Sequence, residues 1–255
     1  MALTAAKVLK AVEQLHKDRP FAEHPLWAGM MTGTHSVPQL QVFAKQFGIL
    51  PLWNNQYHGP LYVICPDPKW REMLAEVVYE EGTGRLYADG LPHNQLYTNF
   101  GIGLGLTRQQ MWKTKYGPGA LGIQKWFKKF CSKSFLEGVS CHMLAGESHG
   151  PGVFGKMAEM LQKKYGLSDQ AVAFWRVHET ADEDHSGIGK KLLGDFAKTQ
   201  KELALVVKTV EATVDKMFAF YDDIYAQMLQ KVENGRPSRR RAAGKASTKK
   251  VRRVH

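Results

Sequence analysis

Residues 173–185 read Ala-Phe-Trp-Arg-Val-His-Glu-Thr-Ala-Asp-Glu-Asp-His, and this stretch is the most informative part of the sequence. Within it, His178, Asp182 and His185 are spaced i, i+4 and i+7. In an α-helix, which turns about 100° per residue, these side chains fall within an arc of about 60°. Two imidazoles and a carboxylate on one face are suitable ligands for a divalent transition-metal ion. The alternative is a charged, solvent-exposed helix face with two incidental histidines.

The residues around this stretch favour a buried helix over an exposed one. Apolar side chains precede the first histidine and continue after the second: Phe174, Trp175, Val177, Ile188, Leu192 and Leu193. Apolar residues at helical spacing indicate a face that packs against other helices. We therefore expect both histidines inside the protein, on a helix that covers residues 168–193.

Three further side chains that can bind a metal lie near predicted helix ends. Glu147 follows an apolar helical turn and lies just before a Gly-Pro break at residues 150–151. Glu80 lies near the end of a predicted helix over residues 70–81, and His93 begins the next segment. Helical bundles build metal sites from carboxylates and histidines on facing helices. Together with the first stretch, these donors suit two ions with bridging carboxylates, and the absence of thiolates favours iron or manganese over structural zinc.

Most of the chain predicts helix, and alternating β-branched runs are almost absent. Ser36 with Gln39, and Thr107 with Gln110, have the spacing of capping boxes, which mark helix starts. Residues 61–65 are the one strand candidate and suit a buried helix equally well. We expect an all-α bundle of about seven helices. Its clearest segments are residues 5–17, 36–47, 70–81, 168–193 and 202–232.

Length and composition limit the class of protein. The chain has 255 residues, of which 44% are hydrophobic and 23% charged, values typical of a soluble globular protein. They exclude a mainly disordered chain, a collagen-like chain and a disulfide scaffold. No apolar run reaches about 18 residues, so we expect no transmembrane segment, and residues 1–21 do not resemble a signal peptide. Cys65, Cys131 and Cys141 form no CxxC motif, which indicates a reducing compartment and a cytoplasmic protein.

The net charge of +11 is concentrated at the C-terminal end. Residues 235–255 hold nine of the 35 Lys and Arg residues and none of the 24 acidic residues. We expect residues 1–234 to fold as one helical domain and residues 235–255 to be a disordered basic tail. Such a tail can contact anionic partners weakly, either nucleic-acid phosphates or a membrane surface. We favour a solubilising tail without a partner, and its lack of aromatic residues argues against binding to single-stranded nucleic acid.

Taken in order, these motifs resemble the heme-oxygenase-like di-iron oxidase superfamily, whose fold is shared with heme oxygenase, thiaminase II and the pyrroloquinoline-quinone synthase C protein. The resemblance covers residues 20–230. Its strongest parts are the glutamate four positions before Pro151 and the Phe-Trp pair before the HxxxDxxH motif. Each short piece is weak alone, whereas their order and spacing together are specific. The other pieces are His24-Pro25-Leu26-Trp27, residues 37–47, Cys65-Pro66-Asp67, Glu80-Glu81-Gly82, residues 93–97 and residues 103–106.

The resemblance implies a non-heme di-iron oxidase or oxygenase that binds two Fe(II) ions, with manganese as an alternative at one position. It further implies O2 as co-substrate, a small organic substrate of amino-acid, amine or fatty-acid type, an external electron donor and a homodimer. His142 and His149 are expected to be structural or to support the ligands, and His24 and His58 to be structural. The implied ligands, which are also the catalytic residues, are Glu80 (with Glu81 as its alternative), His93, Glu147, His178, Asp182 and His185.

One branch of the superfamily forms an aminobenzoate from a tyrosine of its own chain. That branch uses two tyrosines and a lysine where this sequence has Trp27, Gly146 and Met157, with Lys156 one residue short of the lysine position. We therefore expect this chain not to consume its own tyrosine. Two other functions stay open. One is a metal-free enzyme of the thiaminase II or pyrroloquinoline-quinone synthase C type, with Cys141 as candidate nucleophile, and the other is a non-catalytic binding protein.

Overall fold

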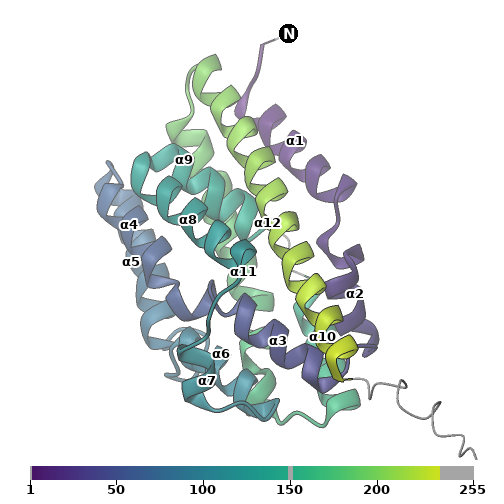
Figure 1. Ribbon diagram of the computed structural model, residues 1–255. Helices are drawn as coiled ribbons and strands as arrows, with labels where there is room; N and C mark the ends of the chain where they lie inside the picture. The colour runs from purple at the N-terminus through teal and green to yellow at the C-terminus, as the bar shows by residue number, and fades with distance from the viewer. Residues whose placement is uncertain (1, 149–151, 236–255) are drawn as a thin grey trace, which may run out of the picture.

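The computed structural model describes residues 2–148 and 152–235, without the side chains of residues 180, 182–184 and 232–235. Within these ranges the chain is helical and contains no β-strand (Figure 1), which confirms the all-α class. The α-helices are α1 (Ala5–Asp18), α2 (Pro25–Thr32), α3 (Val37–Phe47), α4 (Asn55–Ile64), α5 (Pro68–Thr83), α6 (His93–Gly103), α7 (Arg108–Trp112), α8 (Pro118–Lys133), α9 (Phe135–Val139), α10 (Phe154–Tyr165), α11 (Asp169–Phe196) and α12 (Gln200–Gly235).

The expected count of about seven helices is wrong, because the described residues alone contain twelve. The short helices explain the difference. α7 and α9 have five residues each, little more than one turn of about 3.6 residues, which is too short to show a periodic apolar pattern. Three further helical segments complete the chain: the 3₁₀ turns η1 (Phe21–Glu23) and η2 (Pro51–Trp53), and the π-helix η3 (Ser140–Gly146).

The helix starts follow the local signals in the sequence. α3 and α7 begin at the two predicted capping boxes, where the Gln39 side chain accepts a hydrogen bond from the Ser36 N–H at 2.8 Å. The Gln110 side chain accepts one from the Thr107 N–H, also at 2.8 Å. The strand candidate at residues 61–65 is a helix instead, since its first four residues end α4.

α11 and α12 are the long helices around which the others pack (Figure 1). α11 contacts α6, α10 and α5, while α12 contacts α3, α8 and α1, and both contact η3. α4 lies between α5 and α8 in the contact pattern. Segments that are far apart in the sequence therefore meet beside α11, and these segments carry the polar side chains described below.

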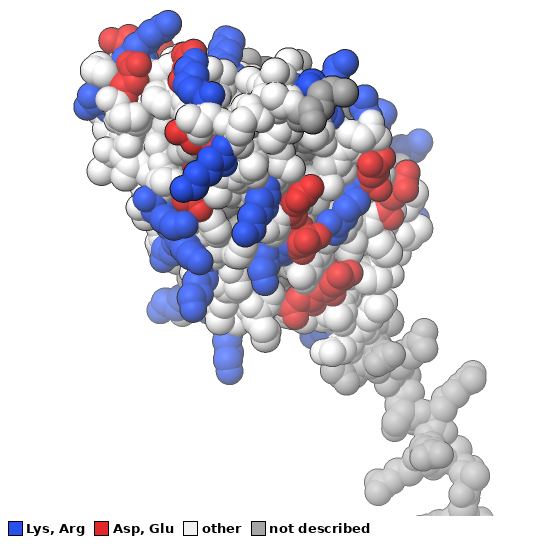
Figure 2. Space-filling view, turned by 90° about the horizontal axis from the view of Figure 1, so that it is seen from above, with Lys and Arg blue, Asp and Glu red and all other residues white. Residues whose placement is uncertain are grey.

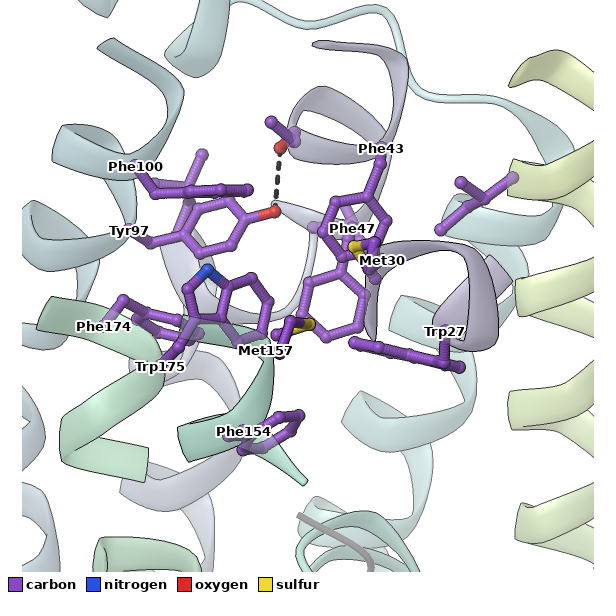
Figure 3. Close-up of a cluster of buried hydrophobic side chains, with 14 of the residues drawn as sticks. Trp27, Met30, Phe43, Phe47, Tyr97, Phe100, Phe154, Met157, Phe174 and Trp175 are labelled. Atoms are coloured by element: carbon purple, nitrogen blue, oxygen red, sulfur yellow. Dashed lines mark hydrogen bonds between the residues drawn. The ribbon is translucent and has the colours of Figure 1, made fainter. Parts of the chain in front are cut away.

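An aromatic cluster fixes the first half of α11 (Figure 3). Trp175 is fully buried, with its ring centroid 5.3 Å from that of Phe100 and 6.0 Å from that of Phe43. Tyr97 is also fully buried, and its hydroxyl donates a hydrogen bond to the Ala44 carbonyl at 3.0 Å. Close-packed aromatic rings stabilise a core beyond the area that they bury. The helix expected over residues 168–193 is therefore packed, and the cluster extends to within one turn of His178.

The described surface mixes charges of both signs. Figure 2 shows Lys and Arg side chains over much of one face, with acidic side chains between some of them. In the described part of the chain, no helix has the length and apolarity needed to cross a bilayer. The basic tail expected from the sequence lies, after residue 235, outside the described residues.

Candidate metal centre

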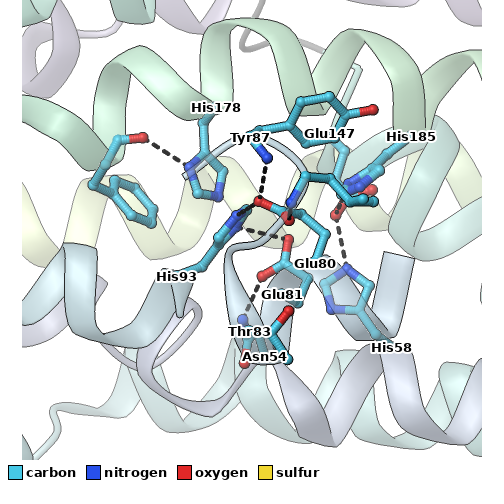
Figure 4. A network of polar contacts seen from close by, with 12 residues as sticks. Asn54, His58, Glu80, Glu81, Thr83, Tyr87, His93, Glu147, His178 and His185 are labelled. Carbon is cyan, nitrogen blue, oxygen red and sulfur yellow. Dashed lines mark hydrogen bonds and ion pairs between the residues drawn. The ribbon is translucent and has the colours of Figure 1, made fainter. Parts of the chain in front are cut away.

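Two groups of side chains that can bind a metal lie along α11 (Figure 4). In each group, one nitrogen or oxygen atom from every residue lies within 4.8 Å of the others. α11 contributes one histidine to each group, because residues seven apart lie on the same face of a helix. The first group is Glu81, His93 and His178, and the second group is His58, Glu147 and His185.

His93 is the centre of the first group. It is the first residue of α6 and is fully buried. Its Nδ1 lies 3.1 Å from Glu81 Oε1, and its Nε2 lies 3.1 Å from Glu80 Oε1. On α11, the Nδ1–H of His178 donates to the Phe174 carbonyl at 2.8 Å, because a carbonyl can only accept. The other ring nitrogen, Nε2, therefore carries a lone pair that is available to a metal.

The two adjacent glutamates at the end of α5 have different surroundings. Glu80 accepts hydrogen bonds from the backbone N–H groups of Leu86 and Tyr87, at 2.5 and 3.1 Å, and so holds the loop after α5. Glu81 accepts a hydrogen bond from the Asn54 side chain and lines a cavity. The geometry thus places Glu81, the alternative from the sequence, in the first group, and Glu80 behind His93.

The second group is arranged around one carboxylate oxygen. Glu147 Oε1 lies 3.1 Å from His58 Nε2 and 3.5 Å from His185 Nδ1. A further imidazole, that of His142, has its Nδ1 3.3 Å from the same oxygen. The other oxygen, Oε2, is buried and has no hydrogen-bond partner among the described residues. Three imidazole nitrogens and a carboxylate therefore converge on a small buried volume.

The π-helix η3 explains how His142 and Glu147 come together. The backbone N–H of Glu147 donates to the His142 carbonyl at 3.0 Å, a bond that spans five residues. A wider turn of this kind places residues i and i+5 beside each other, and such turns are frequent at functional sites. The sequence analysis expected His142 to be structural or to support the ligands, and its Nδ1 lies 3.3 Å from Glu147 Oε1.

The remaining sequence candidates fall into two sets. Asp182 lies in α11 between His178 and His185, at the expected spacing, but its side chain is outside the described residues, as is all of His149. His24 has the structural role expected of it, since its ring accepts a hydrogen bond from the Leu26 N–H at the start of α2.

His58 and His142 were expected to be structural or supporting, and no periodic pattern marks either one. The structure places both against Glu147. The signal that could have found them is composition: five of the ten histidines lie in these two groups or touch them, on four separate helical segments.

A cavity of about 110 Å³ connects the two groups. One side of it is polar and contains residues of both groups. The other side is apolar and aromatic, and includes Trp27, Phe47, Phe154, Phe174 and Trp175. The other four tryptophans, Trp53, Trp70, Trp112 and Trp126, do not line the cavity and pack in the hydrophobic clusters between the helices. Among the described residues that line the cavity there is no Lys or Arg.

The protonation states of these groups suit a cation. Burial lowers the pKa of His178 to about 3 and that of His142 to about 4, so both rings are neutral near pH 7. Burial raises the pKa of Glu147, but the surrounding His142, His185 and His58 imidazoles lower it by more, so the carboxylate is ionised. Neutral imidazoles and ionised carboxylates are the forms that bind metals.

The metal ions that such a donor set implies fit these residues. A buried polar atom without a partner costs about 1–3 kcal/mol. Glu147 Oε2 and both ring nitrogens of His142 are such atoms. A divalent cation would pair with Glu147 Oε2 and accept the lone pair of the neutral His142 ring, and the described residues supply no hydrogen-bond partner for either.

The chain is similar to known proteins over most of its length. A family model for an iron-containing redox enzyme matches residues 41–216. The 4-aminobenzoate synthase of Nitrosomonas europaea is 23% identical over 225 residues, which cover 84% of this chain and 89% of that protein.

Solved structures show the same fold at low sequence identity. A domain with a heme oxygenase-like fold from Shewanella denitrificans OS217 matches with a TM-score of 0.72 and 15% identity, covering 94% of this chain and 99% of that one. A TenA homologue from Pseudomonas syringae pv. tomato matches with a TM-score of 0.68 and 14% identity, covering 88% and 96%. The family model spans more than half of the sequence, and the chain therefore belongs to the heme-oxygenase-like family of iron-containing redox enzymes.

Proposed function

We propose that this protein is a non-heme di-iron oxidase or oxygenase that uses O2 to oxidise a small organic substrate. The observation that carries the proposal is the presence of two separate ligand groups on one cavity with an aromatic wall. Glu81, His93 and His178 would hold one ion, and His58, Glu147 and His185 the other. Asp182 stays a proposed ligand because of its position on α11.

Bound iron in the Fe(II) state would supply the electrons that reduce O2. The protein's own contribution is to hold the ligands and to keep water out. The Glu80 carboxylate orients the His93 ring, and the Phe174 carbonyl fixes the tautomer of His178. The rings of Phe47, Phe154 and Trp175 form the apolar side of the cavity.

The cavity limits the substrate that we propose. A cavity of about 150 Å³ is large enough for benzene, so a volume of about 110 Å³ suits a molecule of a few heavy atoms or one end of a longer one. Since the described lining has no Lys or Arg, a carboxylate of the substrate would have to pair with the metal ions. We therefore favour an apolar reacting group placed against the aromatic wall.

The relative named 4-aminobenzoate synthase suggests a more specific activity, but the residues here argue against the self-consuming form of it. Trp27 and Gly146 line the cavity at the two positions where the sequence comparison expects tyrosines, and Met157 is fully buried at the position of the lysine. We infer that the substrate is a separate molecule.

A metal-free enzyme with a cysteine nucleophile is the second candidate, supported by the fold that it shares with the TenA homologue. Its candidate nucleophile, Cys141, is fully buried and does not line the cavity. Burial raises the pKa of the Cys141 thiol to about 12, so little of the reactive thiolate forms near pH 7. Both observations favour the metal-dependent function.

The test is to load the protein with Fe(II) under anaerobic conditions, remove free metal, and measure iron per chain and O2 consumption. We expect a value near two and O2 uptake by the loaded protein only. His178→Ala should lose the iron of the first group while its circular dichroism stays that of a folded helical protein. A wild-type protein that retains no iron and consumes no O2 would refute the proposal.

A further inference from the structure

His142 is the buried side chain that the proposed ligand set leaves without a role. It lies in η3, is 6% exposed and lines the cavity. Its Nδ1 is 3.3 Å from Glu147 Oε1, but the geometry is not that of a hydrogen bond, and neither ring nitrogen has a hydrogen-bond partner among the described residues. A neutral imidazole offers one donor and one acceptor, and here both are buried and unused.

Packing rather than hydrogen bonding positions this ring. The Phe127 ring meets it edge-on, with centroids 5.4 Å apart and an interplanar angle of 81°. The Tyr57 ring lies 6.0 Å away on α4, and the His58 ring 4.4 Å away. The rings therefore hold the imidazole in one place, with its Nδ1 3.3 Å from the Glu147 carboxylate. An imidazole fixed in this way is prepared to bind a ligand and gains nothing from the protein alone.

We propose that His142 is a fourth protein ligand of the metal ion held by His58, Glu147 and His185. This inference rests on the proposed di-metal function and deepens it. Among the described side chains, the second group would then supply three imidazoles and one carboxylate, whereas the first group supplies two imidazoles and one carboxylate. The sequence resemblance assigned neither His58 nor His142 to the metals, so the nitrogen-rich position is a property of this chain's own residues.

The difference between the two positions has a measurable consequence. Sites rich in imidazole bind the divalent ions late in the first transition series, such as cobalt, nickel and zinc, more strongly than sites rich in carboxylate do. The second position should therefore bind Co(II) more tightly than the first and fill first during a titration. Two equal positions would instead fill together.

The experiment is a Co(II) titration of the metal-free protein, followed by calorimetry and by the absorption of bound Co(II). The wild-type protein should show two classes of site. His142→Leu removes both nitrogens and should weaken the tighter class by more than about tenfold, since loss of even an outer partner of a ligand costs 10–100-fold. It should also change the absorption of the ion bound first. His35→Leu is the control for loss of a buried imidazole elsewhere: His35 is 8% exposed, lies outside both groups and bonds the Leu26 carbonyl, so this variant can lose stability but should bind Co(II) as the wild type does.

A second readout needs no variant. In the Co(II)-loaded wild-type protein, each bound imidazole keeps one N–H proton, whose NMR signal the paramagnetic ion shifts far from the others. We expect one such signal each from His58, His93, His142, His178 and His185. A spectrum that lacks the His142 signal, together with unchanged titration of His142→Leu, would overturn the inference and leave the di-metal centre intact. A wild-type protein that binds no Co(II) would overturn the proposed function as well.

Discussion

Glu80 and Glu81 are adjacent, buried and chemically identical, yet the structure gives them different roles, which a matched pair of substitutions can separate. Glu81→Gln removes the charge of a proposed ligand but keeps an oxygen that can accept the hydrogen bond from Asn54. Glu80→Gln removes the charge behind His93 and replaces one of the two oxygens that accept from the Leu86 and Tyr87 N–H groups. The two variants should fail in different assays.

The magnitudes follow from these contacts. In Glu80→Gln one backbone N–H faces an amide group that cannot accept, which costs about 1–3 kcal/mol of unfolding free energy. The lower half of that range applies, because the side chains of Leu86 and Tyr87 are half-exposed and water can reach the loop. In Glu81→Gln, His93 keeps Glu80 as its partner, so the metal-free protein should change by less than about 1 kcal/mol.

The two variants should rank in the opposite order in metal binding, because Glu81→Gln should lose more bound iron than Glu80→Gln. Loss of Glu80, an outer partner, should weaken the first position by about 10–100-fold, so two ions still bind when iron is in excess. Loss of Glu81 should leave about one ion per chain. Urea unfolding of the metal-free proteins and iron analysis of the loaded proteins measure the two effects. If Glu80→Gln loses one iron and Glu81→Gln retains both, the assignment of Glu81 to the first group is wrong.

Three further predictions follow from the core and from the titrating groups. Trp175→Ala should lower the unfolding free energy by about 3–5 kcal/mol, because the ring is fully buried among other rings, and a loss below 1 kcal/mol in urea unfolding would contradict the packing described. Burial holds the pKa values of His178 and His142 near 3 and 4, below the usual value of about 6.5. The unfolded chain therefore binds protons that the folded chain does not, and the metal-free protein should lose about 1.4 kcal/mol per pH unit for each of them as pH falls from 6.5 toward 4. The carboxylates of Glu81 and Glu80 raise the pKa of His93 against the effect of burial. His93 therefore lowers the unfolding free energy as pH rises above 6.5. An unfolding free energy that increases as pH falls from 6.5 to 4 would contradict this account. Finally, the intact mass of the chain should not change after reaction with O2, and a mass loss mapped to Tyr57 or Tyr221, which line the cavity, would show a self-consuming reaction.

The sequence predicts the parts of this protein that depend on local pattern. The helix at residues 168–193 could be predicted because its apolar spacing extends over many turns and the spacing of its histidines over two. The starts of α3 and α7 could be predicted because a capping box needs only four consecutive residues. Short helices such as α9 were missed because five residues contain hardly more than one period.

The second ligand group shows what pattern cannot supply. His58 comes from α4 and His142 from the π-helix, and both reach Glu147 through the packing of α4, α8 and η3. The choice between Glu80 and Glu81 depended on a loop of nine residues, 84–92, whose backbone N–H groups bind one of the two carboxylates. Contacts across long sequence separations decided the first case, and contacts within a non-helical loop decided the second. Helical periodicity contains neither kind of information.

The most direct test of the central claim is a crystal structure of the Fe(II)-loaded protein with anomalous difference maps measured on both sides of the iron absorption edge. The account predicts two iron peaks on the cavity, one bound by Glu81, His93 and His178, and one by His58, Glu147 and His185. If folded protein treated with excess Fe(II) gave a map with no iron peak at one or both of these groups, the proposed di-iron centre would be contradicted.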